Sequence, residues 1–355
     1  MPRDTTVFID LAAIGDNIAA LKRSLGACQF MAVVKADAYG HGAVAVAQHV
    51  EPMVEAFAVA FTEEAIELRT AGIRKPILIL EGPHSPDDLV TAEEQDLWPA
   101  LHSQYQIDWC VAHRSALPHV WIKIDTGMHR LGLDPQQLAG IGQSLVDKGC
   151  QKLTLMSHLA SAEFPDSALT SQQLSLWRDA LAEWPHEVSL CNSAGSRLGL
   201  ARDDNWARVG YAIYGGLVKD MADNASLKPA MRFETAVLAV RQVKTGESVG
   251  YGGQWTAQRD SVIATLPVGY GDGYPWLAPN GTPVNINGVV APLVGRVSMD
   301  MLTVDVTDCG AVAVGTRAVL WGDDPAIDAV AEVCGTIGYE LMTRMTGRAP
   351  RCYEK

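Results

Sequence analysis

A lysine directly after an apolar run is the residue whose type and position most clearly suggest chemical reactivity in this sequence. Lys35 follows the apolar run 30–34 and precedes the segment ADAYGHG at residues 36–42. At the end of a buried strand an amine is desolvated, which lowers its pKa and makes it nucleophilic enough to form a Schiff base. The glycines and the tyrosine hydroxyl that follow suit the close approach of a bound anion. The segment therefore predicts an amine nucleophile beside an anion-binding turn.

Repeated βα units are expected to position this lysine, because short apolar runs alternate with helical patterns through the first two-thirds of the chain. The expected strands lack strict alternation, as strands covered on both faces do. They span 30–34, 57–60, 77–80, 120–124, 153–156 and 188–190. In the helix expected at 62–69, Thr62 is predicted to be the cap and Gly72 to end the helix. Periodicity alone fits either a barrel or an open doubly wound sheet.

After about residue 230 the sequence changes to β-rich segments with frequent glycine and proline. Asn287-Gly288 predicts a tight hairpin, since both residues tolerate the positive φ of a type I′ turn. Helices are expected at 326–333 and around 340–345. The change in pattern predicts two domains, 1–229 and 230–355.

Composition excludes several classes of partner. The chain has 28 Lys and Arg against 41 Asp and Glu, a net charge of −13 with dispersed basic residues, so nucleic acid and anionic membrane surfaces are not expected partners. No apolar stretch approaches the ~18 residues that a membrane helix needs, and Asp4, Asp10 and Asp16 interrupt any signal-peptide core. Seven cysteines without a C-x-x-C pair predict reduced thiols in the cytoplasm. Nine histidines without an H-E-x-x-H pair give no support to a metal site.

The segment VVKADAYGHG around Lys35 resembles the pyridoxal-phosphate attachment motif of the alanine racemase family, and later segments follow in the family's order. They are KIDTGMHRLG from Lys123, Ser157-His158, Asn192-Ser193, RVGYAIYG from Arg208, VGYG from Val249, GYGDG from Gly269, GRVSMD from Gly295, and Tyr339. The resemblance spans nearly the whole chain. It implies an α/β fold: an N-terminal (β/α)8 TIM-like barrel that binds pyridoxal 5'-phosphate, followed by a predominantly β C-terminal domain.

The resemblance also implies two catalytic bases, because racemisation removes a proton from one face of Cα and returns one to the other. Lys35 would hold the cofactor and serve the D-enantiomer, and Tyr251 would serve the L-enantiomer. A phenol has a pKa of ~10, so Tyr251 needs neighbouring positive charge or donated hydrogen bonds, a role that falls to His158 and Arg208. Arg208 would also face the pyridine nitrogen of the cofactor.

The resemblance also implies roles for the remaining site residues. The cofactor phosphate would be held by Tyr39, Ser193, Tyr339 and the backbone amides of Gly210 and Tyr211, with Asn192 beside Ser193. Tyr211 stands where the family more often has an aliphatic residue. The substrate carboxylate would meet Arg130 and the Met299 amide, while Tyr270 and Asp300 would narrow the entrance. In some family members the lysine that matches Lys123 is carbamylated.

These expectations predict an enzyme that interconverts L-alanine and D-alanine, either to supply D-alanine for peptidoglycan or to convert it for catabolism. The alternative within the same chemistry is a racemase of another small amino acid such as serine. Two alternatives belong to other functional classes: a non-catalytic carrier of the cofactor, and a decarboxylase of similar architecture. The family arrangement implies a homodimer with shared active sites, in which Tyr251, Tyr270, Met299 and Asp300 serve the partner's cofactor.

Overall fold

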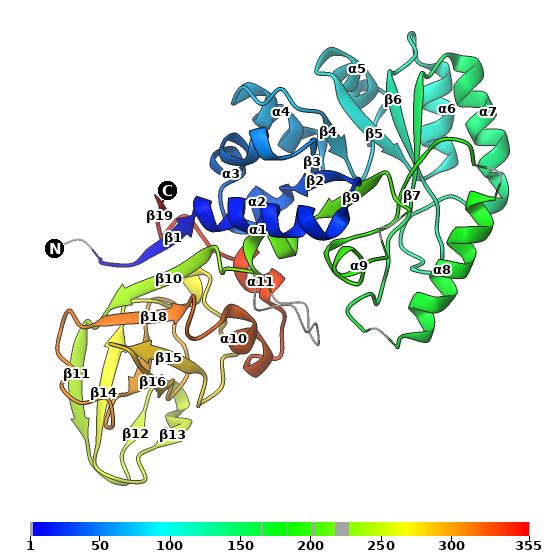
Figure 1. Ribbon diagram of the computed structural model, residues 1–355. Coiled ribbons are helices and arrows are strands. Elements are labelled where there is room, and N and C mark those ends of the chain that lie inside the picture. The colour runs from blue at the N-terminus through cyan, green and yellow to red at the C-terminus, as the bar shows by residue number, and fades with distance from the viewer. Residues whose placement is uncertain (1–2, 165, 183, 201–202, 217–226, 355) are drawn as a thin grey trace.

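A computed structural model describes the chain except for residues 1–2, 165, 183, 201–202, 217–226 and 355. The described residues form a parallel eight-stranded sheet surrounded by helices and a separate group of mainly antiparallel sheets (Figure 1).

The parallel sheet is a barrel. Its strand order is β8-β7-β6-β5-β4-β3-β2-β9, and backbone bonds from Asn205 N to Val188 O (3.0 Å) and from Arg208 N to Cys191 O (3.1 Å) join the two ends. This closure confirms the TIM-like fold that the resemblance implied. The strands are β2 (Gln29–Val33), β3 (Ala56–Val59), β4 (Ile77–Ile79), β5 (Leu97–Leu101), β6 (His119–Lys123), β7 (Lys152–Met156), β8 (Glu187–Ser189) and β9 (Trp206–Val209). The sequence patterns predicted six of them and missed β5 and β9.

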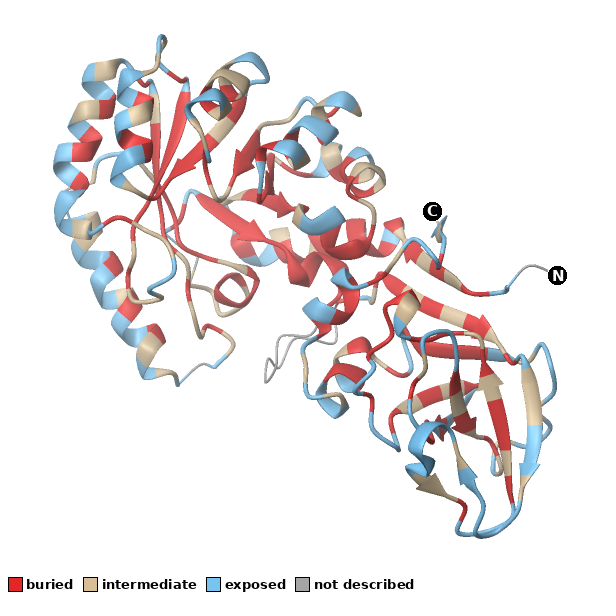
Figure 2. Ribbon diagram, turned by 180° about the vertical axis from the view of Figure 1, so that it is seen from behind, coloured by how far each residue is buried: buried red, intermediate tan, exposed pale blue. Residues whose placement is uncertain are grey.

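Helices cover the outside of the barrel with one apolar face each. In α1 (Leu11–Leu25), Asp10 accepts a hydrogen bond from Ala13 N (2.8 Å), and buried residues recur at helical spacing. Figure 2 shows the strands buried and the outer helix faces exposed. The other helices are α2 (Lys35–Gly40), α3 (Ala43–Val50), α4 (Thr62–Thr70), α5 (Pro86–Glu94), α6 (Gln104–Ala112), α7 (Leu138–Lys148), α8 (Ala168–Leu181) and α9 (Ser193–Arg197).

The start of α4 differs from the prediction. The Thr62 hydroxyl is buried without a hydrogen-bond partner and does not cap the helix. Instead the Glu64 carboxylate accepts hydrogen bonds from Ala60 N (2.7 Å) and Phe61 N (3.2 Å), so an acidic side chain in the first turn satisfies the free amides. Gly72, with φ of 92°, follows the end of the helix as predicted.

The C-terminal part is β-rich, as expected. Asn287 (φ 50°) and Gly288 (φ 87°) form the predicted hairpin turn between β15 and β16. Its strands are β10 (Met231–Ala236), β11 (Ala239–Val243), β12 (Ser248–Val249), β13 (Trp255–Thr256), β14 (Ser261–Leu266), β15 (Pro283–Ile286), β16 (Val289–Pro292), β17 (Leu302–Asp305), β18 (Arg317–Trp321) and β19 (Arg351–Glu354); its α-helices are α10 (Ile327–Val333) and α11 (Gly338–Thr343).

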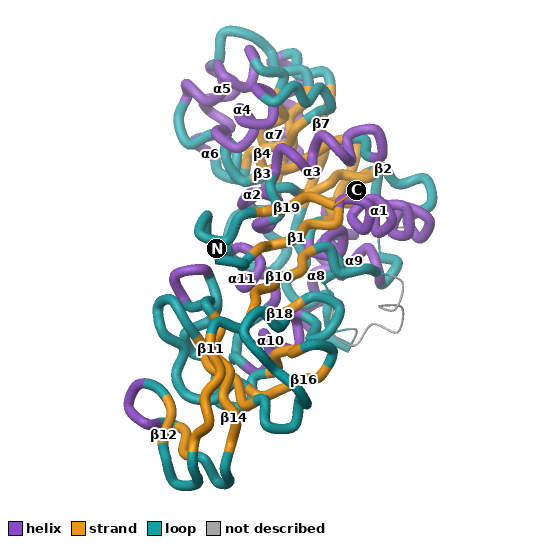
Figure 3. The backbone as a smooth tube through the Cα atoms, turned by 90° about the vertical axis from the view of Figure 1, so that its left-hand side faces the viewer, coloured by secondary structure: helices purple, strands orange, loops and turns teal. Residues whose placement is uncertain are grey.

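The first strand of the chain lies in the C-terminal sheet. β1 (Thr6–Asp10) pairs antiparallel with β10 and parallel with β19. Figure 3 shows these three strands side by side below the barrel. The predicted boundary between residues 229 and 230 follows the change in sequence pattern, but the sheet combines strands from both sides of it.

Asn17 links α1 to the segment before β10 and provides a test of this packing. Its buried side chain donates to Ile213 O (3.1 Å) and Lys228 O (2.8 Å) and accepts from Lys228 N (2.8 Å). Because Asn17→Ala leaves these buried groups unsatisfied, we expect the free energy of unfolding in urea to fall by about 2–3 kcal/mol.

The matched control is Gln143→Ala, which removes an exposed amide bonded only to Asp147. This control should change the free energy of unfolding by less than about 0.5 kcal/mol. Equal effects of the two substitutions would contradict a structural role for Asn17.

Candidate active site

Lys35 lies at the start of an unusual backbone turn at the carboxyl end of β2. The four residues 36–39 have φ between 52° and 54° and ψ between 41° and 53°, which is left-handed helical geometry. None of the four is glycine, and left-handed geometry costs about 1–2 kcal/mol for each such residue. The turn therefore depends on contacts from the rest of the protein.

Two side chains hold this turn from the barrel side. Glu64 accepts a hydrogen bond from Ala36 N (2.6 Å), and the buried His41 Nδ1 lies 3.0 Å from both Ala38 O and Tyr39 O. Burial lowers the pKa of His41 to about 4, so the ring is neutral and its Nδ1–H donates to these carbonyls. Neither residue was among the predicted site residues, although His41 was expected to be structural, because both act on backbone atoms whose position only the folded chain defines.

Positive charge gathers at the carboxyl ends of the barrel strands. Burial lowers the pKa of His158 well below its ordinary value, and the neighbouring cations Arg208, Lys123, Arg130 and Lys35 lower it further. The structure thus brings together the five predicted residues that could carry charge on the barrel side. A neutral His158 favours the second of the two contributions expected of it, a donated hydrogen bond rather than positive charge.

These cations lack carboxylate partners. Lys123 is only 8% exposed, and burial followed by Arg208, Arg130 and Lys35 lowers its pKa to about 8, with Glu81 acting in the opposite direction. Within the described ranges no hydrogen bond or ion pair is formed by the side chains of Lys35, Lys123 or Arg130. The site can therefore accept anionic groups, although the chain as a whole carries a net charge of −13.

Arg208, on β9, is 4% exposed and hydrogen-bonds only to neutral oxygens. It donates to Ser189 O (2.8 Å), Ser189 Oγ (2.6 Å) and Ser157 O (2.5 Å). These bonds fix the guanidinium across the ends of β7, β8 and β9. Its charge is retained, because even after burial lowers the Arg208 pKa to about 10 the group is protonated at neutral pH.

Two further residues that the sequence patterns missed hold the loops of this site. Asp125 accepts hydrogen bonds from three successive backbone amides, 127–129, and so shapes the loop that carries Arg130. Gln173, buried on α8, donates to His158 O (2.9 Å) and accepts from Ala160 N (2.9 Å). The positions of Arg130 and His158 thus depend on polar side chains, Asp125 and Gln173, that bond to the backbone of the loops carrying them.

A neutral cradle lies beside the cation cluster. Ser193 Oγ accepts from Gly210 N (3.1 Å) and Ala212 N (3.4 Å), and a Cβ at Gly210 would lie 2.4 Å from Tyr39 Oη, so only glycine leaves room there. The ring of Tyr339 stacks on that of Tyr211 with centroids 3.6 Å apart.

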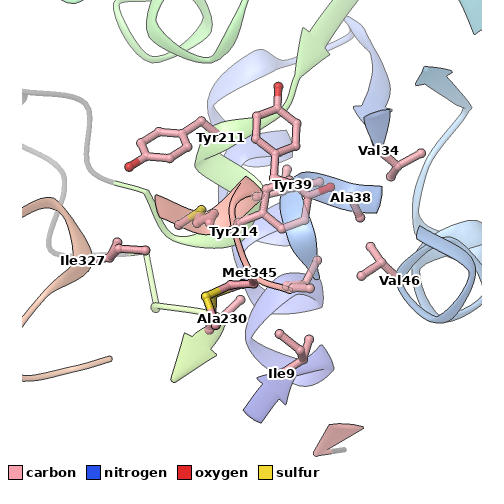
Figure 4. Close-up of a cluster of buried hydrophobic side chains, with 14 of the residues drawn as sticks. Ile9, Val34, Ala38, Tyr39, Val46, Tyr211, Tyr214, Ala230, Ile327 and Met345 are labelled. Atoms are coloured by element: carbon pink, nitrogen blue, oxygen red, sulfur yellow. The ribbon is translucent and has the colours of Figure 1, made fainter. Parts of the chain in front are cut away.

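The tyrosines of this cradle rest on the core between the two parts of the chain. Figure 4 shows Tyr39, Tyr211 and Tyr214 in one buried cluster with Val34 of the barrel and Met345 of the C-terminal part. Tyr214 donates to Val33 O (3.0 Å). Asn192 accepts from Gly195 N (3.0 Å), donates to Leu159 O (3.2 Å) and lies 3.5 Å from His158 Nε2, which connects the cradle to the cation cluster.

The predicted residues of the C-terminal part other than Tyr339 lie away from the cradle and the cation cluster. Tyr270 N donates to Ser298 O (3.1 Å) and Gly271 N to Met299 O (2.9 Å), so the turns that carry Tyr270, Met299 and Asp300 lie together. Tyr251 is 71% exposed, and it lies between β12 and β13. Figures 1 and 3 place these strands at the end of the C-terminal part remote from the barrel. A single chain therefore does not bring Tyr251 to Lys35.

Two other features of the described residues concern function. No helix among them is long and apolar enough to cross a membrane. Within the same residues, no group of three or more His, Cys, Asp or Glu side chains is arranged to hold a metal ion.

Comparisons with known proteins match both parts of the chain. The family model of the alanine racemase N-terminal domain matches residues 9–218, and that of the C-terminal domain matches residues 230–353. The chain is 43% identical to the alanine racemase of Xanthomonas axonopodis pv. citri, over 99% of this chain and 96% of that protein. It is 41% identical to the alanine racemase of Shewanella sediminis, over 98% of both chains.

Solved structures agree with these matches. The biosynthetic alanine racemase of Pseudomonas aeruginosa superposes with a TM-score of 0.96 at 40% identity, over 99% of this chain and 100% of that one. The Bartonella henselae enzyme, described with covalently bound pyridoxal phosphate, superposes with a TM-score of 0.91 at 31% identity, over the same shares. A barrel with a cationic, amine-bearing site and an appended β domain defines the class of amino-acid racemases that depend on pyridoxal phosphate. Within that class, the chain belongs to the alanine racemase family.

Proposed function

We propose that this protein interconverts L-alanine and D-alanine with pyridoxal 5'-phosphate held at Lys35. The observation that carries the proposal is the group of cations without carboxylate partners around Lys35, beside a cradle of neutral donors. When bound, the cofactor supplies electron withdrawal that acidifies the Cα–H of an amino acid. Curated relatives from Xanthomonas, Shewanella and Marinobacter are named alanine racemases, which does not favour the alternative of a serine racemase.

The residues present fit this cofactor. Lys35 offers the amine, and Tyr39, Ser193, Tyr339 and the backbone amides of Gly210 and Tyr211 offer neutral O–H and N–H donors for a phosphate, with Asn192 holding the loop. The close approach of Gly210 to Tyr39 supports a backbone surface shaped for an oxyanion. Arg208 is held by neutral oxygens and has no lone pair to accept a proton, so it donates to a pyridine nitrogen rather than protonating it.

Two groups move the proton on opposite faces of Cα. Lys35 Nζ accepts the proton from D-alanine and returns one to that face, and the Tyr251 hydroxyl does the same for L-alanine. A phenolate at neutral pH needs cations nearby, because the ordinary pKa of tyrosine is ~10. Arg208, Lys123 and Arg130 supply that charge, and the neutral His158 supplies a hydrogen bond.

Substrate recognition combines both parts of the chain. The Arg130 guanidinium and the Met299 amide bind the carboxylate of alanine, and Tyr270 and Asp300 narrow the entrance. Because Tyr251 lies far from Lys35 in one chain, this proposal requires a homodimer in which the C-terminal domain of one subunit covers the barrel of the other. The exposed side chains of Tyr251 and Met299 support such a contact.

We place the reaction in the cytoplasm, where unpaired cysteines remain reduced. The Pseudomonas neighbour is described as biosynthetic, which supports a role in supplying D-alanine for the cell wall rather than in catabolism.

The assay that tests the proposed function measures D-alanine formed from L-alanine in the presence of pyridoxal phosphate. We expect turnover with alanine to exceed turnover with serine. Lys35→Ala and Tyr251→Phe should each lower kcat by about 10²–10⁴-fold, since each removes an acid–base group. Borohydride reduction followed by peptide mapping should leave a pyridoxyl group on Lys35.

Three outcomes of this assay would point to the other functions. A wild-type protein and a Tyr251→Phe variant that both bind pyridoxal phosphate equally well and both lack turnover would indicate a carrier. Stoichiometric release of carbon dioxide would indicate a decarboxylase. Preferred turnover of serine would shift the substrate within the same chemistry.

The shared site predicts complementation between two inactive variants. Mixing Lys35→Ala with Tyr251→Phe subunits produces heterodimers that contain one intact site, so activity should return to about one quarter of the wild-type value after random exchange in a symmetric dimer. The unmixed variants are the controls. Verified heterodimers without activity would contradict shared sites.

Lys123 is proposed to be carbamylated, which would place an anion among the cations. Its neutral amine adds to carbon dioxide with release of one proton, and a pKa of about 8 makes that form increasingly available between pH 7 and 9. In ¹³C-bicarbonate, a carbamate NMR signal should grow over this range. The signal should vanish in Lys123→Ala and persist in Lys152→Ala, whose lysine pairs with Glu187 on the neighbouring strands. An unchanged signal in Lys123→Ala would exclude this lysine.

A further inference from the structure

Arg351, in the last strand of the chain, contacts both ends of the left-handed turn after Lys35. Its Nε donates to Gly40 O (2.7 Å), and its Nη2 lies 2.9 Å from Asp37 Oδ2. A lysine ammonium could reach both oxygens only from its single nitrogen, which would have to lie within hydrogen-bond distance of each of them. The planar guanidinium offers separate donors in a fixed geometry and can hold both oxygens together.

Asp37 extends this contact into the next helix. Its other carboxylate oxygen accepts from Ala43 N (2.7 Å) at the start of α3, and its backbone oxygen accepts from Gly42 N (2.9 Å). The Arg351–Asp37 pair therefore fixes the end of the turn relative to α3 as well as the turn itself.

The C-terminal segment packs directly against the same backbone. A Cβ at Gly40 would lie 2.1 Å from Met342 O, and a Cβ at Gly42 would lie 1.9 Å from Tyr353 Oη. Helix α11, which contains Met342, also carries Tyr339, whose ring centroid is 6.0 Å from that of Tyr39. Residues 339–353 thus contact the backbone at Gly40 and Gly42, the carboxylate of Asp37 and the ring of Tyr39.

The segment is itself anchored. β19 runs parallel to β1 with Val7 paired to Arg351, and Val7 N donates to Pro350 O (3.0 Å). On the opposite side, Glu64 holds Ala36 N. The left-handed residues 36–39 are therefore held at their first amide by Glu64, and at the Asp37 side chain and the following Gly40 O by Arg351 of β19.

We infer that Arg351 is a positioning residue for Lys35: by binding Asp37 and Gly40 O together, it keeps the turn left-handed and so sets where Lys35 and Tyr39 stand. This inference rests on the proposed role of Lys35 as the attachment point of the cofactor. Without Arg351, residues 36–39 relax toward right-handed or extended geometry, and the amine and the Tyr39 hydroxyl lose their common orientation.

The experiment compares Arg351→Met with Arg317→Met in the purified protein supplied with pyridoxal phosphate. Arg317 is the matched control, because it also lies in a strand of the six-stranded sheet and pairs with a single carboxylate, Glu234. Backbone amide exchange is followed by mass spectrometry in peptides covering residues 35–43. We expect Arg351→Met to accelerate exchange there by about tenfold or more, since charge-assisted bonds are lost, and Arg317→Met to leave it unchanged.

The functional readouts separate positioning from general stability. In Arg351→Met the dissociation constant of pyridoxal phosphate should rise about tenfold or more, and kcat should fall more than KM for alanine rises. Arg351→Lys should recover only part of this loss. Ethylguanidinium added to Arg351→Ala should restore part of the affinity for pyridoxal phosphate.

Wild-type exchange in residues 35–43 of Arg351→Met, or equal loss of cofactor affinity in Arg317→Met, would overturn the inference. If Arg351→Met does not fold, Asp37→Asn supplies the same test, because it removes the ion pair and retains the bond to Gly40 O. Amide exchange does not require catalysis. Loosening of the turn in a protein that never racemises alanine would therefore refute the proposed function and leave the role of Arg351 standing.

Discussion

Uncompensated positive charge at the open end of the barrel is the constraint on which the rest of this structure depends. Lys35, Lys123, Arg130 and Arg208 come from separate strands or loops. Lys123 and Arg208 are buried, Lys35 is partly buried and Arg130 is exposed, and all four lower the pKa of His158 beyond the effect of burial. Among the described residues Arg208 bonds only to neutral oxygens and the other three side chains form no ion pair, so this positive charge can be matched by anionic ligands. An internal carboxylate in the same place would stabilise the chain and weaken its affinity for a phosphate and a carboxylate.

Polar side chains that bond to the main chain hold the loops that carry these cations. Glu64, Asp125, Gln173 and His41 each bind main-chain amides or carbonyls in the loops that carry the site residues. Their role explains how a chain with a net charge of −13 keeps a cationic site: the acidic residues close to the site are occupied by backbone donors. Orientation of the reactive groups thus comes from loops that are rigid rather than from direct ion pairs.

Much of the fold could be predicted from local pattern, and the misses have physical causes. β5 contains Pro99, which disfavours a strand assignment, and β9 contains Arg208, whose charge interrupts the apolar run. Thr62 fits the composition of a cap, but the helix begins one residue earlier than that prediction requires, with Phe61 at the cap position and Glu64 accepting from the amides of Ala60 and Phe61. The pairing of β1 with β10 and β19 joins residues more than 200 positions apart, and no local pattern records it.

Motif comparison could locate the residues of the site, but it could not predict their protonation states. The ordered segments from Lys35 to Tyr339 locate the residues, whereas the lowered pKa of His158 follows first from burial and then from nearby cations, and both require the folded chain. The left-handed turn is a similar case, because alanine, aspartate and tyrosine do not favour that geometry locally and contacts from the far end of the chain impose it.

The pairing of the first strand with the last has a consequence for synthesis on the ribosome. The barrel strands are complete when residue 209 has been made, whereas β19, which carries Arg351, begins at residue 351. A nascent chain can assemble the barrel wall early but at that stage lacks the contacts that shape the turn after Lys35. The turn therefore reaches its final geometry only after β19 has been made and has paired with β1.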